Sequence, residues 1–376
     1  SYLINPHNRL HNLDRLALEN FNITKISFQS LVKDGKKKKP LKEVPISLVG
    51  KYCCEDVTVT CMLKHLFMQQ LKEKNLTHLM ETIEMPLLTI LAEMEERGVF
   101  VDKGWLQHLS HEWQQELSSL QQAIFDNIGS EFNLNSPKQL SKVLYDDLQL
   151  PQPKSKGSAY STAANILEKL AVASPIVKKI LEYRSLQKLL STYVDALPKQ
   201  IDPSTNRIHA TFNQSVTATG RLSCQNPNLQ NIPIRSNYGK KIRKGFTPER
   251  RGWSYISFDY SQIELRLLAH FSEDKELVKA FNNNEDIHSY TASLAFEVPI
   301  EEVTKSMRNT AKTVNFGILY GQGAYGLSQQ LNIAQKDAAS FIEKYFERYP
   351  QISLFLVKCK QTAEETGVST TLFGRK

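Results

Sequence analysis

Residues 305–321 read KSMRNTAKTVNFGILYG, and this stretch does most to define the fold and the chemistry of the chain. Within it, Arg308, Lys312, Phe316 and Tyr320 recur at intervals of four, which on an α-helix places them on one slowly drifting stripe. At about 1.5 Å per residue the stripe is roughly 18 Å long, close to the length of a nucleoside triphosphate. The cations could bind phosphates, and the aromatic rings could stack on a sugar and a base. The same spacing also fits an amphipathic helix with a basic rim and an aromatic core contact, and spacing alone does not separate the two.

A second stretch, DYSQIELR at residues 259–266, lies upstream of the stripe. The residues Tyr255–Phe258 predict a strand that runs directly into Asp259. A carboxylate at a strand end is well placed to hold a hard cation such as Mg²⁺, which keeps its other positions for phosphates. A lone Asp is more often a helix cap there, so the octet as a whole carries the prediction. His288, between the two stretches, could bind a phosphate, although a lone His is more often a structural hydrogen-bond donor.

Two polar loops precede these stretches. The first, TATGRLS at 217–223, contains Arg221, and the second, NPNLQNIP at 226–233, contains Gln230 and Asn231. Amide-rich loops suit the minor groove of DNA, where the acceptors are similar for all base pairs. An Asn-rich turn with internal hydrogen bonds is the plainer alternative.

Hydrophobic periodicity predicts a chain that is mostly helical. We expect helices over 46–72, 77–98 and 103–128, one opened by Ser136 and Pro137, more to about 197, and more from 286 to about 366. The alternation of Ile208, Ala210 and Phe212 predicts a strand. The class is therefore α+β, with strands confined to the middle of the chain and to its ends.

Composition narrows the class of protein. The chain has 376 residues, 41% hydrophobic and 23% charged, which is typical of a globular protein of more than one domain. A net charge of +8 favours a polyanionic partner such as nucleic acid. The five cysteines form no CxxC pair and predict free thiols.

Taken together, these motifs resemble those of the family A DNA polymerases, in particular the bacterial members. Residues 259–266 are similar to the family's motif A, residues 308–321 to its motif B, and residues 217–223 and 226–233 to its template–primer loops. The motifs occur in the family's order, and the resemblance extends over the whole chain.

The resemblance implies a role for each matching residue. Asp259 would bind the catalytic Mg²⁺ ions, two in the complete enzyme, together with the Tyr260 carbonyl. The dNTP-binding residues would be Gln262, Glu264, His288, Arg308, Lys312, Phe316 and Tyr320. Among them, Glu264 would exclude a ribose 2′-OH, Phe316 would pack on the sugar and Tyr320 would lie at the nascent base pair.

The resemblance also implies contacts with DNA. Arg221, Gln230 and Asn231 would contact the primer and template near the terminus. The tip of the thumb would comprise residues 135–139, with Asn135 and Lys138, and the loop 151–161, and it would grip the minor groove.

At the N-terminal end, Tyr52-Cys53-Cys54-Glu55-Asp56 is similar to the Tyr-x₃-Asp motif of the family's 3′–5′ exonuclease domain. By that resemblance Asp56 would bind metal and Tyr52 would position the attacking water.

The implied architecture is an α+β, helix-rich right-hand polymerase of palm, fingers and thumb, preceded by the end of a ribonuclease-H-like 3′–5′ exonuclease domain. We expect the C-terminal part of the exonuclease domain at 1–75 and the thumb with connecting helices at 76–204. The first part of the palm with motif A would occupy 205–285, and the fingers with motif B would occupy 286–376.

The resemblance implies template-directed DNA synthesis from dNTP on primer–template DNA, in replication and repair. We expect a monomeric bacterial cytoplasmic enzyme without membrane contact. The sequence stops at Gly374-Arg375-Lys376, before the family's motif C with its second catalytic aspartate, so we expect activity from the parent protein rather than from these residues alone. Three alternatives stay open: a nuclease, a non-catalytic DNA-binding remnant and a single-subunit RNA polymerase.

Overall fold

The computed structural model describes residues 1–34, 37–151, 161–234, 236–331 and 333–376. The chain divides into two compact units. The first comprises Ser1–Tyr255 with Phe373–Arg375, and the second comprises Ile256–Leu372 with Lys376. The domain boundaries expected at 75/76, 204/205 and 285/286 remain predictions, because this division reports compactness alone.

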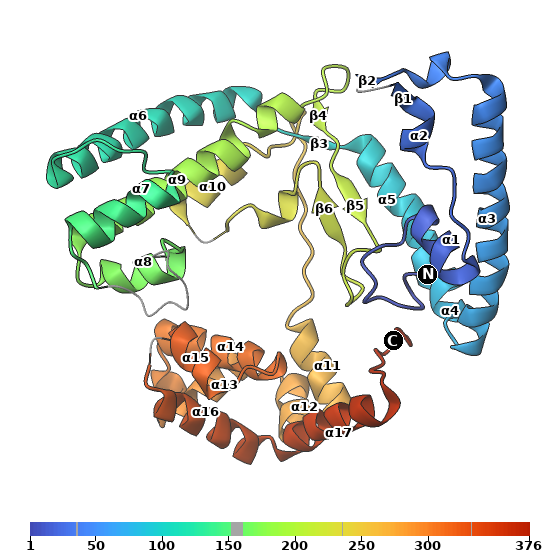
Figure 1. The fold of residues 1–376 in the computed structure, drawn as a ribbon. Helices are drawn as coiled ribbons and strands as arrows, with labels where there is room; N and C mark the ends of the chain where they lie inside the picture. The colour runs from blue at the N-terminus through green and yellow to red at the C-terminus, as the bar shows by residue number, and fades with distance from the viewer. Residues whose placement is uncertain (35–36, 152–160, 235, 332) are drawn as a thin grey trace. The chain divides into compact units, whose positions relative to one another are not determined.

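The N-terminal part of the first unit is built on one long helix, α3 (Ile46–Glu73), as the periodicity predicts. The helices α1 (Leu13–Phe21) and α2 (Phe28–Val32) pack along it (Figure 1). Asn12 caps α1 by accepting from Arg15 N at 2.9 Å. Leu16 and Ala17 of α1 are buried against Val59 and Leu63 of α3.

The next helices lead into the largest core, which is formed by those from Lys103 onward. They are α4 (Thr77–Leu79), the π-helical turn Met80–Glu84, α5 (Met85–Arg97), α6 (Lys103–Ile128), α7 (Pro137–Lys142), α8 (Ala164–Ala171), α9 (Pro175–Leu189) and α10 (Asn237–Arg243). Figure 1 shows α6 and α9 side by side, and Trp113, Leu106 and Ile180 lie fully buried among them. Ser136 caps α7 and Pro137 occupies its first position, as predicted. The helices thus confirm the expected pattern, whereas most of the loop 151–161 lies outside the described residues.

The described strands are short and antiparallel. They are β1 (Lys33–Asp34) with β2 (Lys37–Lys38), β3 (Val99–Phe100) with β4 (Arg207–Ile208), and β5 (Thr211–Asn213) with β6 (Ser223–Gln225). The strand predicted across 208–212 therefore exists as β4 and β5, which pair with different partners. β4, β5 and β6 lie in the middle of the chain, and β1 and β2 lie near its N-terminal end, as expected, whereas β3 lies outside both regions.

The second unit is a bundle of helices. They are α11 (Ile263–Ser272), α12 (Lys275–Asn282), α13 (Ile287–Phe296), α14 (Lys305–Leu319), α15 (Ala324–Leu331), α16 (Gln335–Arg348) and α17 (Pro350–Thr366). Leu268, Val314 and Tyr345 contribute to their shared core. The buried carboxylate of Asp274 accepts from Leu277 N at 3.1 Å and from Gln351 N at 3.2 Å, so one acid caps α12 and the start of α17.

The strand predicted at Tyr255–Phe258 was wrong: these residues have no regular secondary structure. Ile256 is 76% exposed and Phe258 is 92% exposed. A strand is defined by ladder hydrogen bonds to a neighbour, and no segment in the described ranges pairs with this one. Apolar composition alone therefore did not produce the strand.

Within the described part of the chain, every helix is too short or too polar to cross a bilayer.

Candidate functional site

The stripe predicted from the sequence lies along α14, in the second unit. Lys312 is exposed and Arg308 and Phe316 are half-buried, whereas Val314 and Ile318 on other faces are buried in the core. The Phe316 and Tyr320 rings are stacked, with centroids 6.5 Å apart and an interplanar angle of 21°. The helix therefore presents cations and then aromatic rings along one accessible face, which favours the ligand-binding interpretation over a core contact.

The glycine residues at the end of α14 explain why the helix ends where the stripe ends. Gly321 has φ 72°, and Gly321 N bonds Ile318 O at 2.9 Å while Gln322 N bonds Gly317 O at 2.8 Å. This pair of bonds is a Schellman motif, which favours glycine at the left-handed position. A Cβ atom on Gly317 would lie 2.5 Å from Gln322 Oε1, so a side chain there would displace Gln322. The C-terminal turn thus fixes Tyr320 as the last residue of the stripe.

Arg308 is held by an acid that the sequence analysis did not assign to the site. Its Nε donates to Asp286 Oδ2 at 2.5 Å, and its Nη2 donates to Asp286 Oδ1 at 3.3 Å. Asp286 also caps α13, accepting from His288 N at 3.1 Å and Ser289 N at 3.4 Å. Burial raises the pKa of Asp286, but the hydrogen bonds from Arg308 and Ser289 outweigh burial and lower the pKa to about 2. Asp286 therefore stays charged at neutral pH and orients the guanidinium.

His288 lies beneath the stripe and is only 2% exposed. Asn315 Nδ2 lies 3.0 Å from His288 Nδ1, and the His288 ring packs 5.9 Å from the Phe316 ring. Burial, together with the charges of Arg308 and Lys312, lowers the pKa of His288 to about 4 against the opposing effect of Asp286. The ring is therefore neutral at pH 7.

The start of α11 meets the end of α14 within the same unit. Glu264, in the first turn of α11, accepts a hydrogen bond from Tyr320 Oη at 2.6 Å. This bond joins the proposed sugar-selecting carboxylate to the aromatic end of the stripe, which the sequence spacing could not reveal.

Gln262 shows the signs of a strained, functional position. It precedes α11 in the left-handed conformation, with φ 51° and ψ 38°. Its Oε1 atom is buried and has no hydrogen-bond partner among the described residues. Strained backbone and unsatisfied buried polar atoms both concentrate at ligand sites.

Asp259 is exposed to solvent, and no described residue donates a hydrogen bond to its carboxylate. Tyr260 is 80% exposed. No group of three or more His, Cys, Asp or Glu side chains in the described ranges is arranged to hold a metal ion. Mg²⁺ commonly uses one or two carboxylates and completes its shell with water and phosphate oxygens. Asp259 therefore fits as one ligand of such an ion.

The residues predicted to contact DNA lie in the first unit. Arg221, Gln230 and Asn231 are all exposed. Gln230 Nε2 donates to Leu222 O at 3.5 Å, and the Asn231 carbonyl accepts from Tyr193 Oη at 2.7 Å. The two loops are thus joined to each other and to the helical core. Gln230 and Asn231 lie in a short 3₁₀ turn, Leu229–Asn231.

Asn135 and Lys138 flank the cap of α7 and are both exposed. Asn135 lines a pocket of about 900 Å³ that also contains Arg184 and Lys188. The structure therefore leaves these side chains accessible.

Tyr52 and Asp56 lie one turn apart on α3. The Lys25 ammonium donates a hydrogen bond to Asp56 Oδ1 and lies 5.4 Å from the centre of the Tyr52 ring. The sequence analysis did not identify Lys25.

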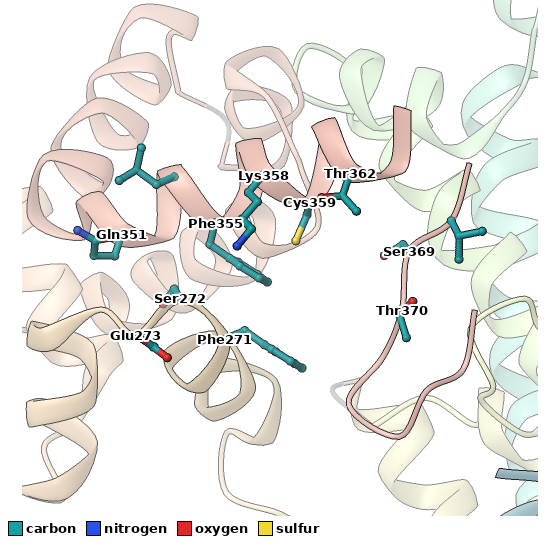
Figure 2. Close-up of a pocket in the computed structure, with 12 residues that line it drawn as sticks. Phe271, Ser272, Glu273, Gln351, Phe355, Lys358, Cys359, Thr362, Ser369 and Thr370 are labelled. Carbon is teal, nitrogen blue, oxygen red and sulfur yellow. The ribbon is translucent and has the colours of Figure 1, made fainter. Parts of the chain in front are cut away.

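A separate pocket of about 570 Å³ lies between the end of α11 and α17. Figure 2 shows Phe355, Lys358 and Cys359 pointing from α17 toward Phe271, whose ring is parallel to that of Phe355 at 5.9 Å. None of the predicted site residues lines it.

Comparison with known proteins finds a matching family, similar sequences and a solved structure of similar fold. The family model described as DNA polymerase family A matches residues 103–376. DNA polymerase I of Treponema pallidum (strain Nichols) is 44% identical over 376 residues, which is 100% of this chain and 37% of that protein. DNA polymerase I of Pseudomonas aeruginosa is 41% identical over 379 residues, covering 100% of this chain and 41% of that protein.

Among solved structures, the POL domain of Pol1 from M. smegmatis, in complex with DNA primer-template and dNTP, matches with a TM-score of 0.84. The identity is 36%, and the match covers 100% of this chain and 62% of that one. The chain thus spans well under half the length of these two curated relatives.

Proposed function

The chain belongs to DNA polymerase family A and has its helix-rich α+β fold, and we propose that it serves template-directed DNA synthesis within a longer protein. The reaction transfers a deoxynucleotide from dNTP to a primer 3′-OH and releases pyrophosphate. The observation that carries the proposal is the accessible stripe of α14, with its aromatic end bonded to Glu264.

The stripe would bind the triphosphate at its cationic end. Asp286 already orients Arg308, so the guanidinium loses little freedom when it meets a phosphate oxygen. Lys312 is exposed and has no ion-pair partner among the described residues, so its ammonium is available. His288, which is neutral because its pKa is lowered, would bind the triphosphate through a ring nitrogen.

The aromatic end would bind the sugar and the base. Phe316 would pack on the sugar, and Tyr320 would lie at the nascent base pair. Glu264 would leave no room for a ribose 2′-OH, because a carboxylate already held by Tyr320 cannot turn away without breaking that bond. Gln262 Oε1, which has no partner within the described residues, could accept a hydrogen bond from the nucleotide or a bound water.

Family A polymerases use divalent metal ions, and we propose two Mg²⁺ ions for the complete enzyme. Bound metal would stabilise the charge that develops on the transferring phosphoryl group. Asp259 would be a ligand through its free carboxylate, and Tyr260 would be one through its carbonyl. We propose that a further acid, from the longer protein, completes the metal site beside Asp259.

Primer–template DNA would be the macromolecular partner. A net charge of +8 favours phosphate contacts. The exposed side chains of Arg221, Gln230 and Asn231 suit sequence-neutral contacts near the primer end, and Asn135 and Lys138 suit the minor groove farther away. We further propose that the protein acts as a monomer in the bacterial cytoplasm.

The test is single-nucleotide incorporation by a protein of the relatives' length that contains this chain. We expect incorporation that depends on Mg²⁺ and matches the template base, and that Asp259→Ala abolishes without loss of primer–template binding. Template-independent addition, or activity that survives Asp259→Ala, would contradict the proposal.

A further inference from the structure

We infer that the Lys25 ammonium occupies the centre of the carboxylate cluster around Asp56. The Tyr52–Asp56 pair is therefore a structural element and holds no divalent metal. This inference concerns the first unit and is independent of the polymerase proposal. It departs from the metal-binding role that family resemblance implies for Asp56.

The cluster joins three segments of the N-terminal region. Lys25 lies between α1 and α2, Asp14 lies in the first turn of α1, and Glu55 and Asp56 lie on α3. The Lys25 ammonium donates to Asp56 Oδ1 and lies 3.8 Å from Asp14 Oδ1 and 3.9 Å from Glu55 Oε2. One cation is therefore at the centre of three acids.

Burial makes this cation hard to displace. The Lys25 side chain is only 1% exposed, whereas that of Asp56 is 28% exposed. An ammonium buried this deeply must keep an anionic partner, since an uncompensated buried charge is strongly unfavourable. The hydrogen bond to Asp56 supplies that partner.

The carboxylates are also engaged elsewhere. Glu55 Oε2 accepts a hydrogen bond from Ile26 N at 2.6 Å, which fixes the loop that carries Lys25. A divalent metal needs ligand oxygens at about 2.0–2.6 Å, and an ion that close to Asp56 Oδ1 would lie against the ammonium.

Tyr52 completes the structural interpretation. Its ring lies 5.4 Å from the Lys25 ammonium, a favourable cation–π distance. The residue that would position an attacking water is instead part of the ion-pair cluster.

The first experiment is a calorimetric titration of the 376-residue chain with Mn²⁺. Both samples carry Asp259→Asn, which removes the exposed acid of the other unit, and one also carries Asp56→Asn. We expect the same Mn²⁺ stoichiometry and dissociation constants within about two-fold. A binding event that disappears with Asp56→Asn would overturn the inference.

The second experiment removes the cation. Lys25→Met keeps a stem of similar length, so it should lower the melting temperature by several degrees, because the acids lose their counter-charge. Millimolar Mn²⁺ should then recover part of the loss in Lys25→Met but none in Lys25→Met/Asp56→Asn, and Lys25→Arg should lose less than Lys25→Met. Unchanged stability in Lys25→Met would refute the role of Lys25, and if that variant fails to fold, the calorimetric comparison still decides.

Discussion

Replacing Asp286 by Asn isolates the charge that orients Arg308. Asn is as good an N-cap as Asp, so α13 should keep the bonds from His288 N and Ser289 N. What the variant loses is the anion that Arg308 grips with Nε and Nη2. The change therefore tests the ion pair with little disturbance of the helix.

The structure gives the magnitude of the stability that Asp286→Asn should lose. The pKa of Asp286 falls from 3.8 to about 2, and at about 1.4 kcal/mol per pKa unit this corresponds to roughly 2.5 kcal/mol. Each side chain is 38% exposed, so solvent screening reduces the expected loss to roughly 1 kcal/mol. Because the folded pKa is depressed, the contribution is complete above the ordinary value and disappears as the pH falls through about 2.

The assay is urea unfolding of wild type and Asp286→Asn at pH values between about 7 and about 2.5. We expect the difference in the free energy of unfolding to shrink toward low pH. In an active protein that contains this chain, KM for dNTP should rise about three- to ten-fold, because Arg308 must then be ordered by the substrate. Glu297→Gln, which removes a carboxylate paired with Lys344 at the other end of α13, is the matched control and should leave KM unchanged. A stability difference that does not vary with pH, together with an unchanged KM, would refute the role of Asp286.

Three further predictions concern the site. Glu264→Ala should raise the ratio of kcat/KM for rNTP over dNTP by roughly ten-fold or more, because it removes a crowding carboxylate and its bond to Tyr320. Glu264→Gln can still accept that bond and should change the ratio less. An unchanged ratio in Glu264→Ala would exclude Glu264 from sugar selection. Phe316→Tyr should reduce discrimination against dideoxynucleotides in chain-termination assays, because the added hydroxyl can replace the missing 3′-OH, and equal discrimination would place Phe316 away from the sugar. The 376-residue chain alone should bind primer–template with an affinity that falls steeply with salt concentration. It should not extend the primer in a gel assay. Robust extension would require a second metal-binding carboxylate within these residues.

Sequence reasoning located the stripe well because its causes are local. Residues spaced four apart lie on one face whenever the segment is helical. Gly321 supplies the left-handed conformation that ends the helix. The cap at Ser136 is equally local, since its side chain accepts a hydrogen bond from the backbone nitrogen three residues away.

Features that depend on distant partners were missed. Asp286 is 22 residues before Arg308, and nothing in the intervening sequence signals their pairing. Lys25 likewise reaches Asp56 across 31 residues. The strand predicted at Tyr255–Phe258 failed for the same reason, because a strand needs a neighbour that composition does not specify.

The most direct measurement is the effect of Lys312→Ala on dNTP use and on DNA binding, in an active protein that contains this chain. Lys312 is the exposed cation at the centre of the stripe, and Lys360, exposed on α17, is the matched control. If α14 binds the triphosphate, Lys312→Ala should lower kcat/KM for dNTP by roughly ten- to hundred-fold through a lost charge-assisted bond. The dissociation constant for primer–template should change less than about two-fold, and Lys360→Ala should change neither quantity. A weakened primer–template complex with an unaffected dNTP dependence would instead make α14 a template surface and contradict the assignment.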